Sequence, residues 1–143
     1  MKFPRKIPFV ETLGFELIRF EDGEAELQLD VQPNQHNTWH VAHGGVIMTL
    51  LDVAMAHAAR SRITDIAGVA TIEMKTSFMR PAEGVLRAQG RLLHRTASMA
   101  FCEGRVIDAK DQLCAQSTGT FKILRSAPPP AHGQPSDPNL QKP

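Results

Sequence analysis

The sequence has few cysteines, almost no net charge and no apolar run long enough to cross a membrane. Cys102 and Cys114 are its only cysteines and lie in segments of alternating polarity, so we expect buried, reduced thiols in place of a disulfide. A net charge of +1 gives no indication of a nucleic-acid or membrane partner. The basic start of the chain, 1–6, is followed by no sustained apolar stretch, which predicts a cytoplasmic location without a signal peptide.

The longest apolar segment, 43–59, opens with His-Gly-Gly and predicts a helix rich in Leu, Met and Ala. Only Thr49, Asp52 and His57 interrupt its apolar residues, so we expect other structure to surround this helix. A carboxylate within such a helix is costly to bury without a partner or a function. Asp52 is therefore the first candidate functional residue.

The other segments predict a short N-terminal helix within 3–12, with Pro8 in its first turn, and a β-hairpin that turns at Asp22-Gly23. Strands are expected at six positions: 13–20, 25–31, 67–79, 84–95, 98–109 and 112–124. The long helix is the only large apolar element that can cover the sheet. The sequence therefore predicts an α+β domain over 1–125, with an antiparallel sheet wrapped around one central helix, and a flexible, Pro-rich tail over 126–143.

Alternating polarity in the segment 67–79 predicts which of its side chains face the helix. Ile72, Met74 and Phe78 alternate with charged or polar residues. We therefore expect these three side chains on the dry face of the sheet.

The two glycines at the start of the long helix form a candidate anion site. A helix N-terminus has unpaired N–H groups and a partial positive charge, and glycine lets a ligand approach the backbone. Gly44 and Gly45 are therefore a candidate oxyanion hole, although a Gly-Gly pair also eases a tight turn. Gly44 and Asp52 lie about 12 Å apart along a helix axis and cannot both reach one carbonyl group. If both serve one site, Asp52 comes from a second subunit, which predicts a two-fold dimer.

The pattern Asn37-x5-His43-Gly44-Gly45-x6-Asp52 resembles that of the hotdog-fold acyl-CoA thioesterases, in particular the phenylacetic acid degradation (PaaI-like) branch. The resemblance covers residues 10–124, including a strand that ends in Arg-Pro. It implies a hotdog fold and hydrolysis of a thioester to a carboxylic acid and free coenzyme A. It also implies no metal or redox cofactor, since coenzyme A is part of the substrate, and self-association as a dimer or a dimer of dimers.

The resemblance implies a catalytic role for five residues. Asp52 would act as general base, through water, or as nucleophile, through a covalent anhydride. The Gly44 N–H would bind the carbonyl oxygen, and the Asn37 amide would help to polarise it. His43 would lie near the leaving sulfur or hold the loop, and Thr71 would help to hold the water beside the acid.

Substrate-binding roles are expected for four more residues. Gly45 lies beside the oxyanion donor, and Trp39 stands where it can cover the acyl pocket. The phosphates of coenzyme A require arginines, and Arg80 and Arg95 are preferred because each lies at a strand end next to a turn. The other candidates are Arg60, Arg62, Arg87, Arg91 and Arg105.

Two other functions stay open. One is a hotdog enoyl-CoA hydratase or dehydratase, with His43 and Asp52 as its acid–base pair, although the loop lacks the Asp-x-Asn-Pro-x-His pattern of the hydratases. The other is a non-catalytic acyl-CoA binder, which the presence of Asn37, Gly44 and Asp52 does not favour. Release of free thiol from an acyl-CoA would separate the thioesterase from both alternatives, and water addition to an enoyl-CoA would identify the hydratase.

The remaining histidines receive structural interpretations. His36, His40 and His43 are close in sequence, but no second ligand motif accompanies them, so we expect no metal site. Asp52 and His57 point about 140° apart on a helix and do not converge. His57 is therefore expected to be a hydrogen-bonded residue of the core or of an interface.

Overall fold

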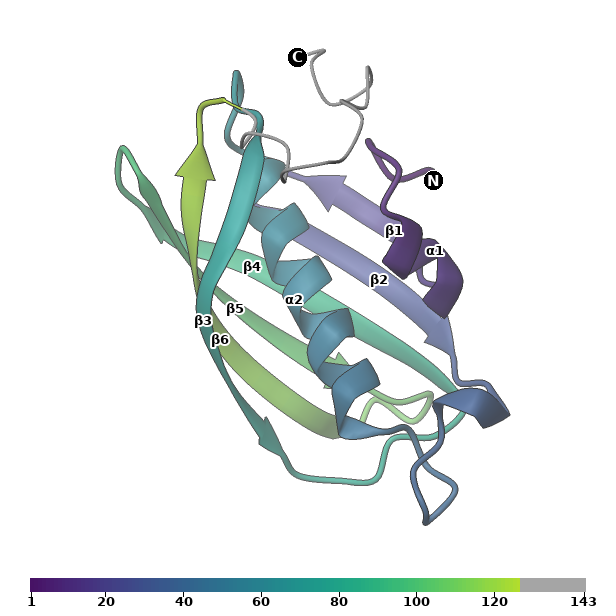
Figure 1. Cartoon of the computed structure of the whole chain (residues 1–143). Helices are drawn as coiled ribbons and strands as arrows, with labels where there is room; N and C mark the ends of the chain where they lie inside the picture. The colour runs from purple at the N-terminus through teal and green to yellow at the C-terminus, as the bar shows by residue number, and fades with distance from the viewer. Residues whose placement is uncertain (127–143) are drawn as a thin grey trace, which may run out of the picture.

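The computed structural model describes residues 1–126; apart from Ser126, the tail expected over 126–143 lies outside the described residues. In chain order the elements are α1 (Pro8–Leu13), β1 (Glu16–Glu21), β2 (Glu24–Asp30), η1 (Pro33–Gln35), α2 (Gly44–Arg60), β3 (Gly68–Phe78), β4 (Val85–Arg95), β5 (Met99–Ile107) and β6 (Leu113–Leu124). The six strands form one antiparallel sheet, in the order β1-β2-β4-β5-β6-β3, that curves around α2 (Figure 1). The predicted α+β hotdog architecture is confirmed.

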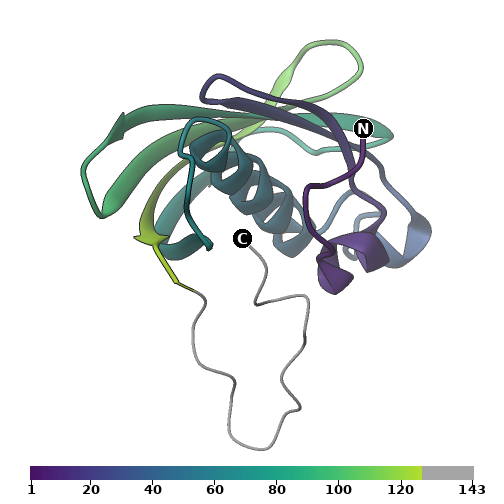
Figure 2. The same cartoon turned by 90° about the horizontal axis from the view of Figure 1, so that it is seen from above.

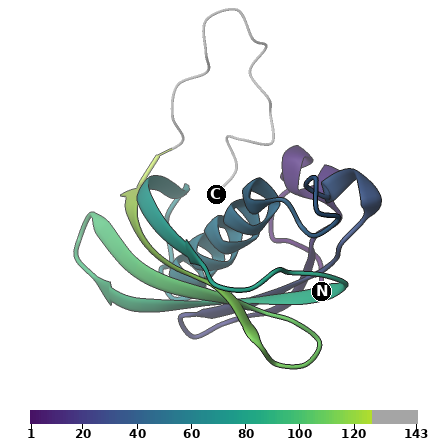
Figure 3. The same ribbon diagram turned by 90° about the horizontal axis from the view of Figure 1, so that it is seen from below.

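The sheet is a single curved layer on one side of α2, as the views from above and below show (Figure 2, Figure 3). Its first hairpin turns at Asp22 and Gly23, both with left-handed φ, as the sequence predicted. Within residues 1–126, no helix combines the length and the hydropathy that crossing a membrane requires.

The N-terminal helix has Pro8 in its first turn, as the sequence predicted, but occupies only part of the range 3–12. A helix that began at residue 3 would hold Pro8 in its interior, where the ring clashes with the preceding turn and no N–H is available. α1 instead begins at Pro8 and ends before Gly14, whose left-handed φ of 75° closes the helix. The residues before Pro8 reach α2, where the Phe3 ring lies 5.2 Å from the ring of His57.

α2 lies close to the sheet because three glycines face it. A Cβ at Gly90 would lie 2.4 Å from the backbone oxygen of Ala54, so no side chain fits between strand and helix at this point. Gly104 and Gly119 leave room for the fully buried Met55 side chain. The surrounding core consists of inward-facing residues of sheet and helix, including Leu27, Leu29, Leu50, Leu51, Leu86 and Phe121.

β3 is an edge strand with a β-bulge. Thr71 and Glu73 pair with consecutive residues of β6, so Ile72 is an extra residue between them. The expectation that Ile72 lies on the dry face is wrong: its side chain is 54% exposed, because the bulge shifts the alternation by one residue. Thr71 consequently faces α2, on the same side of the sheet as Phe78.

One face of α2 is not covered by the sheet of its own chain, although the sequence predicted a helix surrounded by other structure. Burial is incomplete at Gly45, Thr49, Asp52, Ala56 and Arg60, whereas most residues between them are buried. This spacing of three or four residues places the five positions on one side of the helix. We call this side the open face of α2; it lies beside the edge strand β3 (Figure 1).

Candidate active site

Asp52 lies midway along the open face, with Thr71 opposite it on β3. The Thr71 hydroxyl donates a hydrogen bond to Oδ1 of Asp52, with 2.7 Å between the oxygens. Burial raises the pKa of Asp52 above its ordinary value of 3.8, and the Thr71 hydrogen bond acts in the opposite direction by stabilising the ionised carboxylate. Such a pair is suited to holding a water molecule beside a base, because a raised pKa brings the carboxylate closer to the working pH.

The start of α2 offers one free backbone donor, not two. His43 is the N-cap of the helix, and its Nδ1 accepts the N–H of Gly45 at 2.8 Å. The N–H of Gly44 has no acceptor among the described residues and lies at the positive end of the helix dipole. The Phe78 ring lies beside it, 3.4 Å from the position that a Cβ of Gly44 would take. Gly44 is therefore the better placed of the two glycines to bind an oxyanion.

Asn37 holds the loop that leads into α2. Its Oδ1 accepts the backbone N–H groups of Trp39 at 2.9 Å and of Val41 at 3.4 Å. Its own backbone N–H donates to the carbonyl oxygen of Val41 at 2.8 Å. Because Oδ1 is engaged by the loop, the Nδ2 group is the part of the amide that can donate to a ligand.

A cavity of about 620 Å³ opens beside the start of α2. Its lining is mostly apolar and includes Asn37, Trp39, Ile47, Gly44, Phe78, Arg80 and Pro81. The Trp39 residue is 80% exposed, and Arg80 donates a hydrogen bond of 3.1 Å to the carbonyl oxygen of Leu113. An apolar cavity with a few polar groups at one end is typical of a site for a small organic group.

Arg95 lies at the opposite end of the sheet from Arg80. It pairs with Ala100, which belongs to the apolar cluster that also contains Ala59 and Ile63, near the end of α2. The structure therefore does not bring the two preferred arginines together within one chain.

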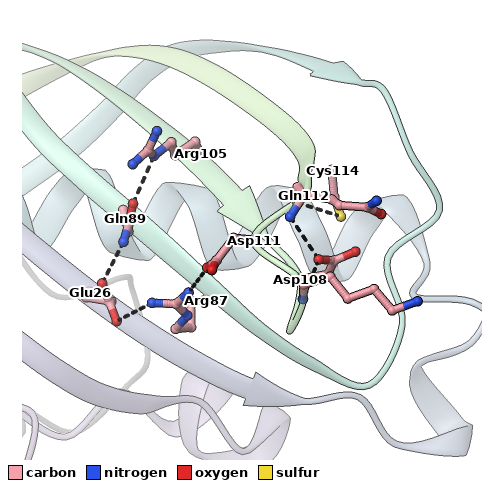
Figure 4. Close-up of polar contacts among 9 residues, drawn as sticks. Glu26, Arg87, Gln89, Arg105, Asp108, Asp111, Gln112 and Cys114 are labelled. Atoms are coloured by element: carbon pink, nitrogen blue, oxygen red, sulfur yellow. Dashed lines mark hydrogen bonds and ion pairs between the residues drawn. The ribbon is translucent and has the colours of Figure 1, made fainter.

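A second cavity, of about 550 Å³, lies on the sheet. The polar side chains around it form hydrogen bonds and ion pairs with one another. Figure 4 shows a continuous series of contacts through Arg105, Gln89, Glu26, Arg87 and Asp111. Opposite charges that pair in this way are typical of a solvated sheet surface. The candidate site is therefore placed at α2.

His57 and the loop histidines have structural surroundings. His57 is 3% exposed, its Nδ1 lies 2.8 Å from the carbonyl oxygen of Val53, and it packs between two phenylalanine rings. It is thus a hydrogen-bonded core residue, as predicted, and burial lowers its pKa, which favours the neutral ring. The rings of His36 and His40 contact each other with centroids 6.3 Å apart. Residues 1–126 contain no group of three side chains suited to binding a metal.

One chain assembles the site in two separate halves. Asn37 and Gly44 lie at the cavity, whereas Asp52 and Thr71 lie about 12 Å further along the helix axis. Phe78, beside Gly44, was not predicted as a site residue; its inward alternation on the strand was the only signal for it.

Similar proteins are known. A family model described as the thioesterase superfamily matches residues 40–115. The medium/long-chain acyl-CoA thioesterase YigI of Salmonella typhimurium is 27% identical over 137 residues, which cover 85% of this chain and 88% of that protein. The structure of the conserved protein PA5202 from Pseudomonas aeruginosa matches with a TM-score of 0.79 and 30% identity, over 83% of this chain and 95% of that one. The phenylacetic acid degradation-related protein from Ralstonia eutropha matches with a TM-score of 0.76 and 25% identity, over 83% and 92% of the two chains.

Proposed function

The chain belongs to the thioesterase superfamily, and we propose that it hydrolyses an acyl-coenzyme A to a carboxylic acid and free coenzyme A. The observation that carries the proposal is the presence on α2 of a base and an oxyanion donor. The base is Asp52, with Thr71 at 2.7 Å, and the donor is the N–H of Gly44 at the helix start. The similarity to a protein named as an acyl-CoA thioesterase supports the same reaction.

In the proposed reaction, Asp52 removes a proton from water while the water oxygen forms a bond to the thioester carbon. The Thr71 hydroxyl fixes the orientation of the carboxylate. The electron pair displaced from the carbonyl bond moves to its oxygen, where the Gly44 N–H and the Asn37 amide stabilise the charge. When the carbonyl bond re-forms, the carbon–sulfur bond breaks, and the sulfur leaves with the proton that Asp52 had taken. Direct attack by Asp52 through an anhydride is the alternative course.

The two halves of the site require two subunits. We propose a two-fold dimer whose α2 helices lie antiparallel, so that Gly44 of one subunit faces Asp52 of the other. Exposed apolar side chains support an interface here: Met48 on α2 is 37% exposed, and Phe78, on the side of the edge strand β3 that faces α2, is 54% exposed. The alternative assembly in this proposal is a tetramer that consists of two such dimers.

The geometry argues against the hydratase alternative. Since Nδ1 of His43 accepts the Gly45 N–H, the neutral ring carries its proton on Nε2. Losing that proton to a substrate would leave an imidazolate unless the helix cap broke. Thioester hydrolysis requires no proton from His43, which leaves it free to hold the loop.

The cavity favours an apolar acyl group, because most of its lining is apolar. The names of the relatives include both medium/long-chain acyl groups and phenylacetic acid, and each of these is apolar. The proposed reaction uses no metal or redox cofactor, because side chains and backbone supply both the base and the oxyanion donor. A cytoplasmic location accompanies a coenzyme A substrate in this proposal.

The test is thiol release from a panel of aryl- and fatty-acyl-CoA substrates by the native protein and by Asp52→Asn. We expect the variant to lose about 10²–10⁴-fold in kcat while keeping its fold and its association state. Asp65→Asn changes an exposed carboxylate in the same way and serves as the control. No thiol release from any substrate would refute the reaction, and full activity of Asp52→Asn would refute the mechanism.

Mixed dimers test whether the site is shared. Asp52→Asn subunits are combined with Gly44→Pro subunits, each inactive alone. If a site takes Asp52 from one subunit and Gly44 from the other, each mixed dimer holds one intact site, and random mixing restores about one quarter of the native activity. Sites contained within single subunits would give no restoration.

A further inference from the structure

Arg60 is the last residue of α2. Its side chain is partly buried and forms neither a hydrogen bond nor an ion pair with any of residues 1–126. Its neighbour Arg62, by contrast, lies 3.6 Å from a carboxylate oxygen of Asp22. Guanidinium groups present five N–H donors and are normally matched by carboxylate, carbonyl or phosphate oxygens.

A second arginine, Arg5, lies near the same end of α2. Arg5 reaches across from the N-terminal segment and donates a hydrogen bond to the carbonyl oxygen of Ala67, just before β3. The segment is held there by the contact of Phe3 with His57 on α2. Burial lowers the pKa of Arg60, and the like charge of Arg5 lowers it further, with no acidic group in opposition. Two adjacent cations that repel each other form a site that an anion would stabilise.

This arginine pair lies in line with the proposed base. Asp52, Ala56 and Arg60 follow one another at intervals of four residues along the open face of α2. Arg60 is therefore about 12 Å beyond Asp52 along the helix axis. In coenzyme A the pantetheine arm holds the diphosphate at a comparable distance from the thioester sulfur.

The position also keeps the pair accessible in the proposed dimer. If Gly44 of one subunit faces Asp52 of the other, the two-fold axis crosses α2 near Met48. Arg60 then lies about 18 Å from the axis along the helix, at the edge of the interface. A nucleotide bound there would extend into solvent.

We propose that Arg5 and Arg60 bind the phosphate groups of the coenzyme A moiety when its thioester lies at Asp52 of the same subunit. This inference rests on the proposed function, and it replaces Arg80 and Arg95 as the principal phosphate ligands. The pantetheine arm would follow the open face of α2 from the Thr71–Asp52 pair to the two guanidinium groups. Each arginine can donate two parallel N–H groups to one phosphate in a fixed planar geometry that a lysine ammonium lacks.

The experiment compares acyl-CoA with the matching acyl-pantetheine, which lacks the nucleotide and the diphosphate. For Arg60→Gln and Arg5→Gln we expect KM for the acyl-CoA to rise about tenfold or more with little change in kcat. KM for the acyl-pantetheine should equal that of the native protein. Arg62→Gln, at the same helix end but already paired with Asp22, is the matched control and should behave as the native protein with both substrates.

Binding of free coenzyme A, measured by calorimetry, separates this inference from the proposed function. A native protein that releases no thiol but binds coenzyme A at least tenfold more tightly than Arg60→Gln would refute the reaction and support the phosphate site. Equal affinity of the native protein and Arg60→Gln would overturn the site. An equal rise in KM for acyl-CoA and acyl-pantetheine in Arg60→Gln would also overturn it. Melting curves of both variants confirm that the comparison concerns folded protein.

Discussion

The hydroxyl of Thr71 and the carboxylate of Asp52, 2.7 Å apart, join the edge strand β3 to the open face of α2. The bulge at Ile72 makes this contact possible, because it turns Thr71 towards the helix together with Phe78. The hydrogen bond stabilises the ionised form of an acid whose pKa burial has raised. It therefore opposes the rise in the pKa of the Asp52 carboxyl and also fixes its orientation.

Removing the hydrogen bond between Thr71 and Asp52 should shift the pH profile of the proposed reaction. In Thr71→Val the pKa of Asp52 rises further, since the interaction that stabilises its ionised form is lost. The acidic limb of the profile of kcat/KM should shift to higher pH. Thr71→Ser keeps the hydroxyl and should retain the native profile. A Thr71→Val profile that coincides with the native one would contradict the role of this contact.

Gly44→Pro removes one N–H from the start of α2. Proline is favoured at the first helical position, and His43 before it has the extended backbone, φ −61° and ψ 139°, that proline requires of its predecessor. We expect kcat to fall about 10²–10³-fold, as for loss of one oxyanion donor. Gly44→Ala adds a Cβ at 3.4 Å from the Phe78 ring but keeps the N–H, and should remain within about tenfold of native activity. Equal losses in both variants would indicate a steric effect.

Asn37→Asp separates the two functions of the amide. An aspartate oxygen still accepts the N–H groups of Trp39 and Val41, so the loop is retained, but the Nδ2 donor is lost. We expect kcat/KM to fall about 100-fold while fluorescence of Trp39, the only tryptophan, stays unchanged. Asn37→Ala should lower activity and also shift the emission. A fully active Asn37→Asp would exclude the amide from the reaction.

Asp52 should make the protein less stable at neutral pH. Its native pKa is raised, so it favours folding while protonated, and this contribution is lost as the pH rises through the native pKa. Asn at this position is neutral at every pH. Thermal melts of Asp52→Asn should therefore give a Tm above the native value at pH 7, with the difference closing near the ordinary pKa of 3.8. A lower Tm of the variant at pH 7 would contradict this prediction.

Gly90 should be the glycine that tolerates substitution least. A Cβ there would lie 2.4 Å from the backbone oxygen of Ala54, which cannot move without displacing α2. We expect Gly90→Ala to lower the free energy of unfolding by about 3 kcal/mol or more in urea titrations. At Gly68 nothing lies within 4 Å of an added Cβ, and Gly68→Ala should change it by no more than about 0.5 kcal/mol. Equal unfolding midpoints for the two variants would rule out the close approach.

Much of the fold could be predicted from the sequence because its signals are local. The apolar segment 43–59 places α2 to within one residue at each end, and the turn at Asp22-Gly23 joins the first two strands as expected. The candidate residues Gly44 and Asp52 share one helix, so their spacing alone defines their separation.

The features that the sequence did not predict depend on contacts that its local patterns do not encode. Alternation assumes a regular strand, so it could not place Ile72, which the bulge exposes. A glycine pair suggests two free N–H groups, but His43 occupies that of Gly45. The approach of Arg5 to Arg60 joins residues 55 positions apart and has no signature in either local sequence.

If the eight-residue separation of Gly44 and Asp52 divides the proposed site between two subunits, activity depends on protein concentration. If neither subunit holds a complete site, specific activity is proportional to the fraction of dimer, and it falls on dilution below the dissociation constant. A substitution at Met48, an exposed residue of α2 outside the proposed catalytic groups, should then leave the rate per assembled site unchanged while shifting the protein concentration at which activity disappears. Turnover measured over a dilution series of the protein would thus give the free energy of dimer association, with no separate measurement of molecular size.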